Sequence, residues 1–206
     1  MRERTGFDAV PRGRSQGLVA AVLVLLVAAL AGCAFDEIDE GEAPLEAARV
    51  ELVASSAAEP CPSTHVIVQG TAEDDLLIGT AASECFVAGD GDDHIAAGGG
   101  DDIVHGGNGD DSVDGGSGND IVHGGLGADF INGGPGNDTL HGGADRDLIL
   151  GGTGADLVAG DDGDDSLSGE AGNDLLDEGR GIGSHDGGAG VDTCVGAATT
   201  RRSCER

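Results

Sequence analysis

A large aliphatic or aromatic residue recurs at every ninth position over most of this chain. From Gly70 to Val195 the sequence divides into fourteen consecutive nine-residue blocks without an insertion or deletion, for example GGSGNDIVH (115–123). Twelve of these blocks carry a large apolar residue at the eighth position, and twelve carry aspartate at the sixth. Because successive side chains on a strand point to opposite faces, the last three residues of a block predict a minimal strand whose middle side chain points inward. The pattern therefore predicts a repeat architecture with one short strand per block.

The first six positions of a regular block combine glycines with an acid, which is typical of a tight turn. Glycine at the first, second and fourth positions permits positive φ and lets carbonyl groups point to one side. Within the array, Asp145, Asp161 and Glu170 replace such glycines. The blocks 79–87 and 178–186 lose most of the motif, so we do not expect complete metal sites at these two blocks.

The repeated pattern GGxGxDxUx, in which U is a large aliphatic residue, resembles the nonapeptide of RTX or hemolysin-type calcium-binding proteins. The resemblance covers residues 70–195. It implies an all-β fold, a parallel β-roll (a β-solenoid) in which two repeats make one coil, so that identical turns recur every 18 residues. In that family each calcium ion lies between stacked turns. It is held there by the sixth-position aspartates of two successive coils and by turn carbonyls.

The resemblance assigns the candidate calcium ligands to two columns, one at each edge of the roll. The first column is Asp75, Asp93, Asp111, Asp129, Asp147 and Asp165, and the second is Asp102, Asp120, Asp138, Asp156, Asp174 and Asp192. If each gap between successive members holds one ion, up to about ten Ca²⁺ ions can bind. We expect the additional fifth-position acids on the solvent side, where they raise the local negative field; they are Asp74, Asp92, Asp101, Asp110 and Asp164.

Composition favours a fold that depends on this metal. The 206 residues include 40 glycines and 39 acidic residues but only four phenylalanines and no Trp or Tyr, so little apolar area is available for a core. Stacked carboxylates would also repel one another. We therefore expect the chain to be largely unfolded without calcium and a rigid rod with it. The formal charge of −29 excludes a nucleic-acid binder, whose surface would be basic.

The N-terminal segment predicts export. Four arginines precede an apolar run at 18–31, which is too short to span a bilayer comfortably but suits a signal peptide. The run ends in Leu-Ala-Gly-Cys33, which resembles the lipobox of bacterial lipoproteins. The resemblance implies that residues 1–32 are a lipoprotein signal peptide and that Cys33 is lipidated and becomes the mature N-terminus. An ordinary cleaved signal beside a cysteine is the alternative.

Residues 33–60 are acidic and nearly free of glycine, and we interpret them as a tether between the lipid and a β-roll domain at 61–206. The alternative is a short helix that caps the roll. Residues 33–206 carry six arginines against 37 acidic residues, a formal charge of −31.

Four more cysteines flank the array. In the implied roll, seven coils at ~4.8 Å give a rod about 34 Å long. Cys61 and Cys85 then lie at one end, and Cys194 and Cys204 lie at the other. Because the Cα atoms of a disulfide lie within about 7 Å of each other, we expect the pairs Cys61–Cys85 and Cys194–Cys204. Both would pin the degenerate terminal blocks. Free thiols are the alternative, which export to an oxidising compartment disfavours.

His105, His123 and His141 share the ninth position of alternate blocks and should form a column on one outer face. We interpret this column as part of a solvated face. A transition-metal site or a pH sensor is the alternative, since imidazole suits such ions.

These features together predict a non-enzymatic, calcium-folded module. We expect it on the bacterial cell envelope or extracellular surface, lipid-anchored after general secretory export, as an adhesive, scaffold or spacer. Its predicted partners are calcium and, through the N-terminal lipid, a membrane, but no nucleic acid. The alternative is a remnant or accessory repeat domain of a secreted RTX-type enzyme or toxin. Against that alternative, the sequence contains no HExxH, its one GxSxG match (13–17) lies within the predicted signal peptide, and we expect no catalytic domain before the array.

Overall fold

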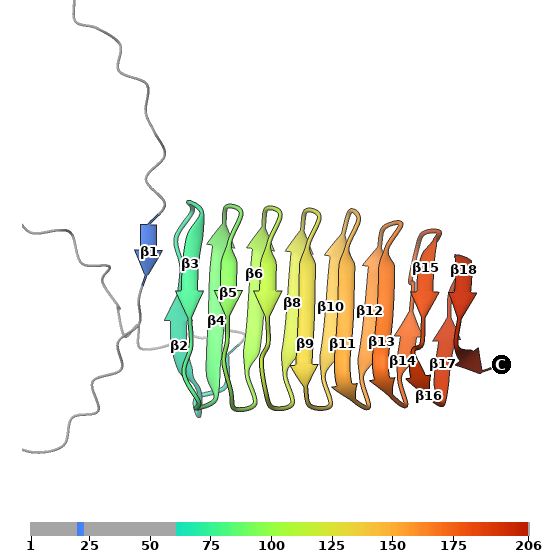
Figure 1. Cartoon of the computed structure of the whole chain (residues 1–206). Coiled ribbons are helices and arrows are strands. Elements are labelled where there is room, and N and C mark those ends of the chain that lie inside the picture. Colours follow the sequence, from blue (N-terminus) through green and yellow to red (C-terminus); the bar gives the residue numbers. More distant parts are fainter. Residues whose placement is uncertain (1–19, 23–60, 206) are drawn as a thin grey trace, which may run out of the picture.

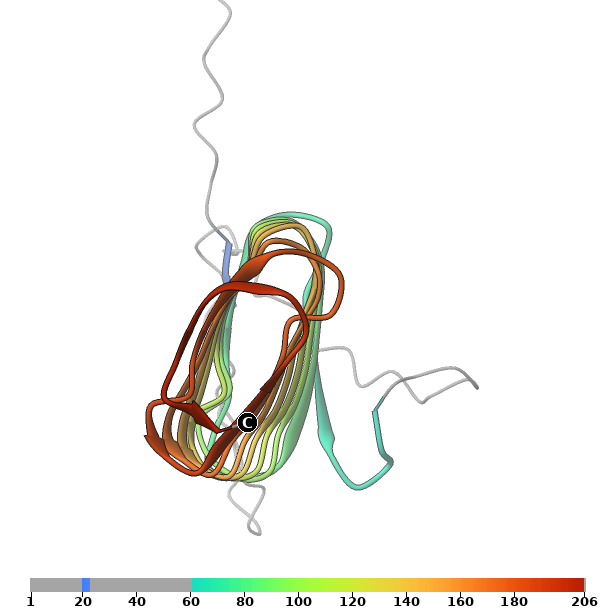
Figure 2. The same ribbon diagram turned by 90° about the vertical axis from the view of Figure 1, so that its right-hand side faces the viewer.

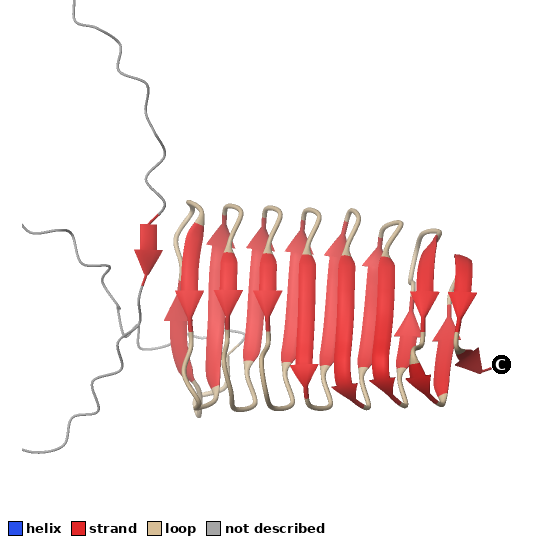
Figure 3. Ribbon diagram, in the orientation of Figure 1, coloured by secondary structure: helices blue, strands red, loops and turns tan. Residues whose placement is uncertain are grey.

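Two parallel sheets face each other along the length of the molecule in the computed structural model (Figure 1). The structure describes residues 20–22 and 61–205, so Cys33, the tether and most of the predicted signal peptide lie outside the described residues. Every regular element in these ranges is a strand, and they contain no helix long and apolar enough to cross a membrane. The chain passes from one sheet to the other through tight turns at the two edges (Figure 3).

The strands alternate between the two sheets along the sequence. In spatial order, the first sheet contains β1 (Ala20–Val22), β3 (Asp75–Ile78), β5 (His94–Ala96), β7 (Ser112–Asp114), β9 (Phe130–Pro135), β11 (Leu148–Gly154), β13 (Ser166–Gly172), β15 (Gly183–Asp186) and β18 (Ala198–Arg202), with β16 (Ala189–Gly190) beside β13. The second contains β2 (Val66–Gln69), β4 (Glu84–Asp90), β6 (Ile103–Asn108), β8 (Ile121–Leu126), β10 (Thr139–Ala144), β12 (Leu157–Asp162), β14 (Leu175–Asp177), β17 (Asp192–Val195) and β19 (Cys204–Glu205).

The register of these strands confirms the parallel β-roll with two blocks per coil. Val104 pairs with Val122, and Val122 pairs with Leu140, each step being 18 residues. Seen along the axis, the coils superimpose as a flattened oval (Figure 2). Equivalent positions of alternate blocks therefore lie directly above one another, which places the turn residues in columns.

The eighth position of each block forms the core, as the sequence predicts. Its side chains point between the two sheets and are nearly all fully buried, from Leu77 through Leu176 to Cys194. The column begins one block earlier than the sequence analysis placed it. Val68 is buried at the eighth position of 61–69, and Val66 pairs with Glu84 at the regular 18-residue spacing. This block lacks the glycines and the aspartate, so only its apolar residue marks it.

Both ends of the roll are fastened by disulfides, and both expected pairings are confirmed. Cys61 and Cys85 have Cα atoms 5.8 Å apart, and the corresponding distance between Cys194 and Cys204 is 5.7 Å. The last coil is shorter than the others, because Asp192 pairs with Cys204 only 12 positions later. The pairing of β15 with β18 contains a register shift for the same reason.

Positive φ at the second position of a block explains the glycine there. A Cβ on Gly134 (φ +97°) would collide with the carbonyl oxygen of Gly116 in the preceding coil. Asp161 and Glu170, which replace glycine at this position, keep the left-handed backbone at 69° and 65°, and Asp145 keeps it at a fourth position at 79°. The stacked coils impose this conformation, and a side chain with a Cβ is strained in it.

Substituting Glu170→Gly should stabilise the roll, because glycine adopts positive φ without steric cost. In saturating calcium we expect the free energy of unfolding to rise by about 1 kcal/mol, the usual cost of one left-handed residue. The matched variant Gly134→Ala, in the same column of second positions, should lower it by more than about 1 kcal/mol. Urea unfolding followed by circular dichroism measures both. A neutral or destabilising effect of Glu170→Gly would contradict the assignment of strain.

Candidate metal sites

The sixth-position aspartates form two columns of buried carboxylates, one at each row of turns. The structure brings all twelve predicted residues into these columns, and each is at most 3% exposed. Within a column, the backbone N–H of one aspartate donates to Oδ1 of the aspartate 18 residues later, over 2.7–3.0 Å. One carboxylate oxygen of every column aspartate except Asp75 thereby holds two successive turns together, with Asp102 accepting the N–H of Glu84.

The second carboxylate oxygen is buried without a hydrogen-bond donor in nearly every turn. The set consists of Oδ1 of Asp75 and Oδ2 of Asp93, Asp102, Asp111, Asp120, Asp129, Asp138, Asp147, Asp156, Asp165, Asp174 and Asp192. Burying a charged oxygen without a partner is costly, and a bound cation is one of the few groups that can compensate it. The orphaned oxygens therefore mark two rows of candidate cation sites.

Backbone carbonyls turn toward the same spaces. A Cβ on Gly133 would lie 2.6 Å from Asp138 Oδ2 and 2.6 Å from the carbonyl oxygen of Gly151 in the next coil. The first-position glycine thus leaves a cradle that a side chain would fill, with a carboxylate oxygen and a carbonyl oxygen on its walls. The same arrangement recurs at Gly115, beside Asp120 Oδ2 and the Gly133 carbonyl, at 2.8 and 2.9 Å.

This donor set fits Ca²⁺. Its atoms are all oxygens, which a hard cation prefers, and they come from both carboxylates and carbonyls. Among the residues that the structure describes, no three His, Cys, Asp or Glu side chains converge to hold a metal ion, so carbonyls must complete any site. A bound calcium ion would supply the positive charge that the paired carboxylates lack.

Burial raises the pKa of ten of the column aspartates above the ordinary value of 3.8. Desolvation is the largest cause, the hydrogen bond from the preceding backbone N–H opposes it, and in most of them neighbouring acids add to it. The pKa reaches about 7 for Asp111, Asp120 and Asp147 and about 6 for Asp102, Asp129, Asp156 and Asp165, and it is raised for Asp93, Asp138 and Asp174. Without a cation, at a pH between about 4 and 7, the folded chain therefore holds protons on these carboxyl groups that the unfolded chain releases.

The fifth-position acids lie on the solvent side, as expected, but they also have a structural role that the sequence analysis missed. Asp92 Oδ1 accepts the backbone N–H of Asp110 at 2.9 Å, and Asp110 Oδ1 accepts that of Ala128 at 2.8 Å. These bonds run from each coil back to the one before it, opposite to the sixth-position bonds. Asparagine takes the same role at Asn119 and Asn137, which is the signal that the position requires an acceptor side chain.

The two degenerate blocks use their carboxylates differently. Glu84 stands at a sixth position, and its two carboxylate oxygens accept the hydroxyl and the backbone N–H of Thr80. In the block 178–186 the sixth position is Gly183, and Glu178 from the first position reaches the backbone N–H of Asp165. The sequence analysis assigned no role to Glu178 or to His185, which contacts it.

The three column histidines stack on the outer face of the second sheet. The ring centroids of His105 and His123 are 5.2 Å apart and those of His123 and His141 are 5.1 Å apart. The rings are half-buried rather than fully solvated, and burial lowers the pKa of His105 and His123, assisted by the neighbouring ring. His141 Nδ1 lies 3.0 Å from Asp161 Oδ2. The rings are stacked and do not converge on one point.

Comparison with known proteins agrees with this geometry. The family model of the RTX calcium-binding nonapeptide repeat (4 copies) matches residues 87–122, 114–149, 123–158, 141–176 and 150–183. These ranges contain the regular part of both aspartate columns. A comparison with curated proteins found no match.

The raised pKa values predict that acid stabilises the calcium-free roll. The unfolded aspartates titrate near 3.8 and the folded ones at up to about 7, so the unfolded chain binds fewer protons between these values. In calcium-free buffer, β structure and the free energy of unfolding should therefore be greatest at about pH 4 and fall as pH rises toward 7. A pH series of far-UV circular dichroism with urea unfolding measures this.

In saturating calcium the trend should reverse, because protons compete with the cation for the carboxylates. A calcium-free chain whose β content is unchanged between these pH values would contradict the buried, uncompensated state of the columns.

Proposed function

The chain carries RTX calcium-binding nonapeptide repeats across residues 87–183, and from this premise we propose that it is a calcium-folded module anchored by a lipid on Cys33. Its place is the bacterial cell envelope or the extracellular surface, where it acts as an adhesive, a scaffold or a spacer. The proposal includes a non-enzymatic role, export by the general secretory route and Ca²⁺ held by the twelve column aspartates.

The two rows of buried carboxylate oxygens without a donor carry the calcium part of the proposal. A chain with one apolar side chain per block has little else to offset the repulsion within each row. Binding of Ca²⁺ and formation of the coils then become one equilibrium, since the ligands come together only when the turns stack. Extracellular calcium modules bind at about 10⁻⁴–10⁻³ M, a range that suits a surface protein.

The solenoid supports the role of adhesive, scaffold or spacer. Its coils stack in one direction, so a rod of regular cross-section projects both sheet faces along its whole length (Figure 1). The lipobox-like sequence before Cys33 supports the anchor, and the acidic segment 33–60 would separate the rod from the membrane. Stacked repeats of this kind create extended binding surfaces.

Calcium titration of the lipid-free chain tests the first part of the proposal. Residues 34–206 should change from coil to β structure cooperatively as CaCl₂ rises toward millimolar, followed by far-UV circular dichroism, and magnesium should not replace calcium. Asp129→Asn should raise the calcium midpoint about tenfold, because the loss of one charged ligand costs about 1.4 kcal/mol. The matched variant Asp101→Asn should change it less than about twofold, since asparagine already serves at fifth positions.

A chain that is already β-rich in EGTA would show that the coils do not need the metal. A chain that stays disordered throughout would show that calcium does not fold these repeats.

Metabolic labelling with palmitate in a bacterial host tests the anchor. The wild-type chain should incorporate the label and partition into the detergent phase of Triton X-114, because acyl chains bury apolar area in a membrane. Cys33→Ser should lose both properties. The matched variant Cys61→Ser removes a cysteine outside the lipobox and should keep them. Label retained by Cys33→Ser would contradict lipidation at this residue.

A further inference from the structure

The block 178–186 departs from the repeat at three positions that lie close together in the fold. Glutamate replaces glycine at the first position (Glu178), glycine replaces aspartate at the sixth (Gly183) and histidine replaces the apolar residue at the eighth (His185). His185 is the one histidine in the core column of the fourteen blocks, and it lies in the block that lacks a sixth-position acid. The side chains of Glu178 and His185 are both 0% exposed.

Glu178 takes over one function of the missing aspartate. Its Oε1 accepts the backbone N–H of Asp165 at 3.1 Å, the bond that a sixth-position Oδ1 makes in every regular step of the column. A Cβ on Gly183 would collide with this oxygen, so the glycine leaves the space that the carboxylate occupies. The first and sixth positions have therefore exchanged acid and glycine, while the carboxylate stays in the column.

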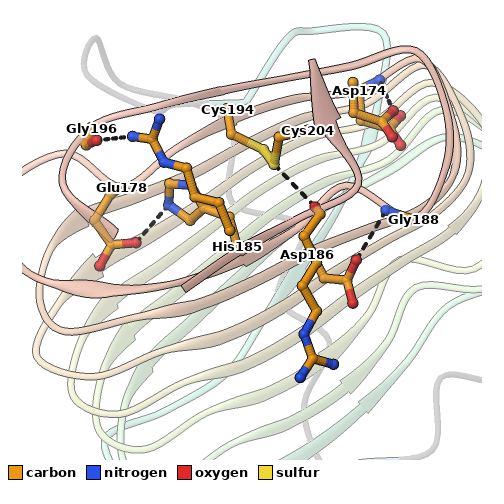
Figure 4. Close-up of a disulfide and its surroundings, with 11 residues drawn as sticks. Asp174, Glu178, His185, Asp186, Gly188, Cys194, Gly196 and Cys204 are labelled. Atoms are coloured by element: carbon orange, nitrogen blue, oxygen red, sulfur yellow. Dashed lines mark hydrogen bonds and ion pairs between the residues drawn. A yellow bond between two sulfur atoms is a disulfide. The ribbon is translucent and has the colours of Figure 1, made fainter. Parts of the chain in front are cut away.

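The second oxygen of Glu178 differs from its counterparts. In the regular turns that oxygen is buried without a donor and faces a candidate cation site. In this block Oε2 lies 2.9 Å from Nε2 of His185, within the closed end of the roll (Figure 4). His185 therefore gives this carboxylate oxygen a partner within the protein, which the corresponding oxygens of the regular turns lack.

We propose that His185 takes the place of a calcium ion beside Glu178 Oε2, so that the turn of block 178–186 binds no Ca²⁺, whereas Asp165 Oδ2 keeps its own cradle between Gly160 and the Glu178 carbonyl. This inference rests on the proposed calcium function and specifies the turn of the first column at which calcium binding ends. The first column would then be closed at its C-terminal end by an internal Glu–His pair, next to the Cys194–Cys204 disulfide. The last coil would need no metal of its own at this edge.

Counting bound ions tests the proposal on the full chain, purified in detergent. His185→Leu restores an apolar core residue and leaves Glu178 Oε2 without a donor, like the orphaned oxygens of the regular turns. The triple variant Glu178→Gly, Gly183→Asp, His185→Leu restores the regular motif. Equilibrium dialysis with radioactive calcium at saturation should show one more ion per chain in both variants than in the wild type. His94→Leu, an exposed histidine on β5, is the matched control and should leave the number unchanged.

An unchanged number of ions in the triple variant, with β structure verified by circular dichroism, would overturn the proposal. So would a triple variant that no longer folds in calcium, because glycine at position 183 would then be required by the nearby Asp165 carbonyl and not by the missing ion. If His185→Leu alone fails to fold, the triple variant decides. A wild-type chain that binds no calcium would instead overturn the proposed function, whereas normal binding without the additional ion refutes only the role of His185.

Discussion

Like charges buried one above another are the constraint on which this molecule depends. An 18-residue coil places each sixth-position aspartate directly over its counterpart, in a space that water does not reach. Carboxylates held in this way repel each other and resist ionisation, as their raised pKa values indicate. The first-position glycines leave space beside these carboxylates, and backbone carbonyls line that space. The apolar residues at the eighth positions pack between the two sheets and hold them together.

Hydrogen bonds in two directions keep the coils in register despite this repulsion. The sixth-position carboxylates bind the N–H groups of the coil before them, while the fifth-position side chains bind those of the coil after them. A slip of one residue would break both sets and turn the apolar column outward. Protein contacts therefore fix the geometry that the turns adopt when the coils form and the cation binds.

Most of this architecture could be predicted from the sequence, because a nine-residue repeat without insertions places equivalent residues of successive coils directly above one another. The two repeated positions, the apolar residue and the aspartate, predict one short strand per block, and the resemblance to the RTX nonapeptide implies the parallel sheets, the 18-residue register and the two columns of carboxylates. The exchange of acid and glycine between Glu178 and Gly183 could not be predicted position by position, because each substitution by itself resembles the loss of one motif residue. Also missed were Val68, whose block keeps only the apolar residue, and the acceptor role of the fifth position, which Asp, Asn and Ser share.

The short last coil has a consequence for how such molecules behave in solution. A solenoid that ended on a full, regular coil would present a row of unpaired backbone groups, a ready template for another chain. Here the final strands β18 and β19 are out of step with the period, and a disulfide fixes that departure. A second molecule arriving with an 18-residue coil finds no matching ladder to extend. The strand register at this end is therefore mismatched to a second roll that would stack on it.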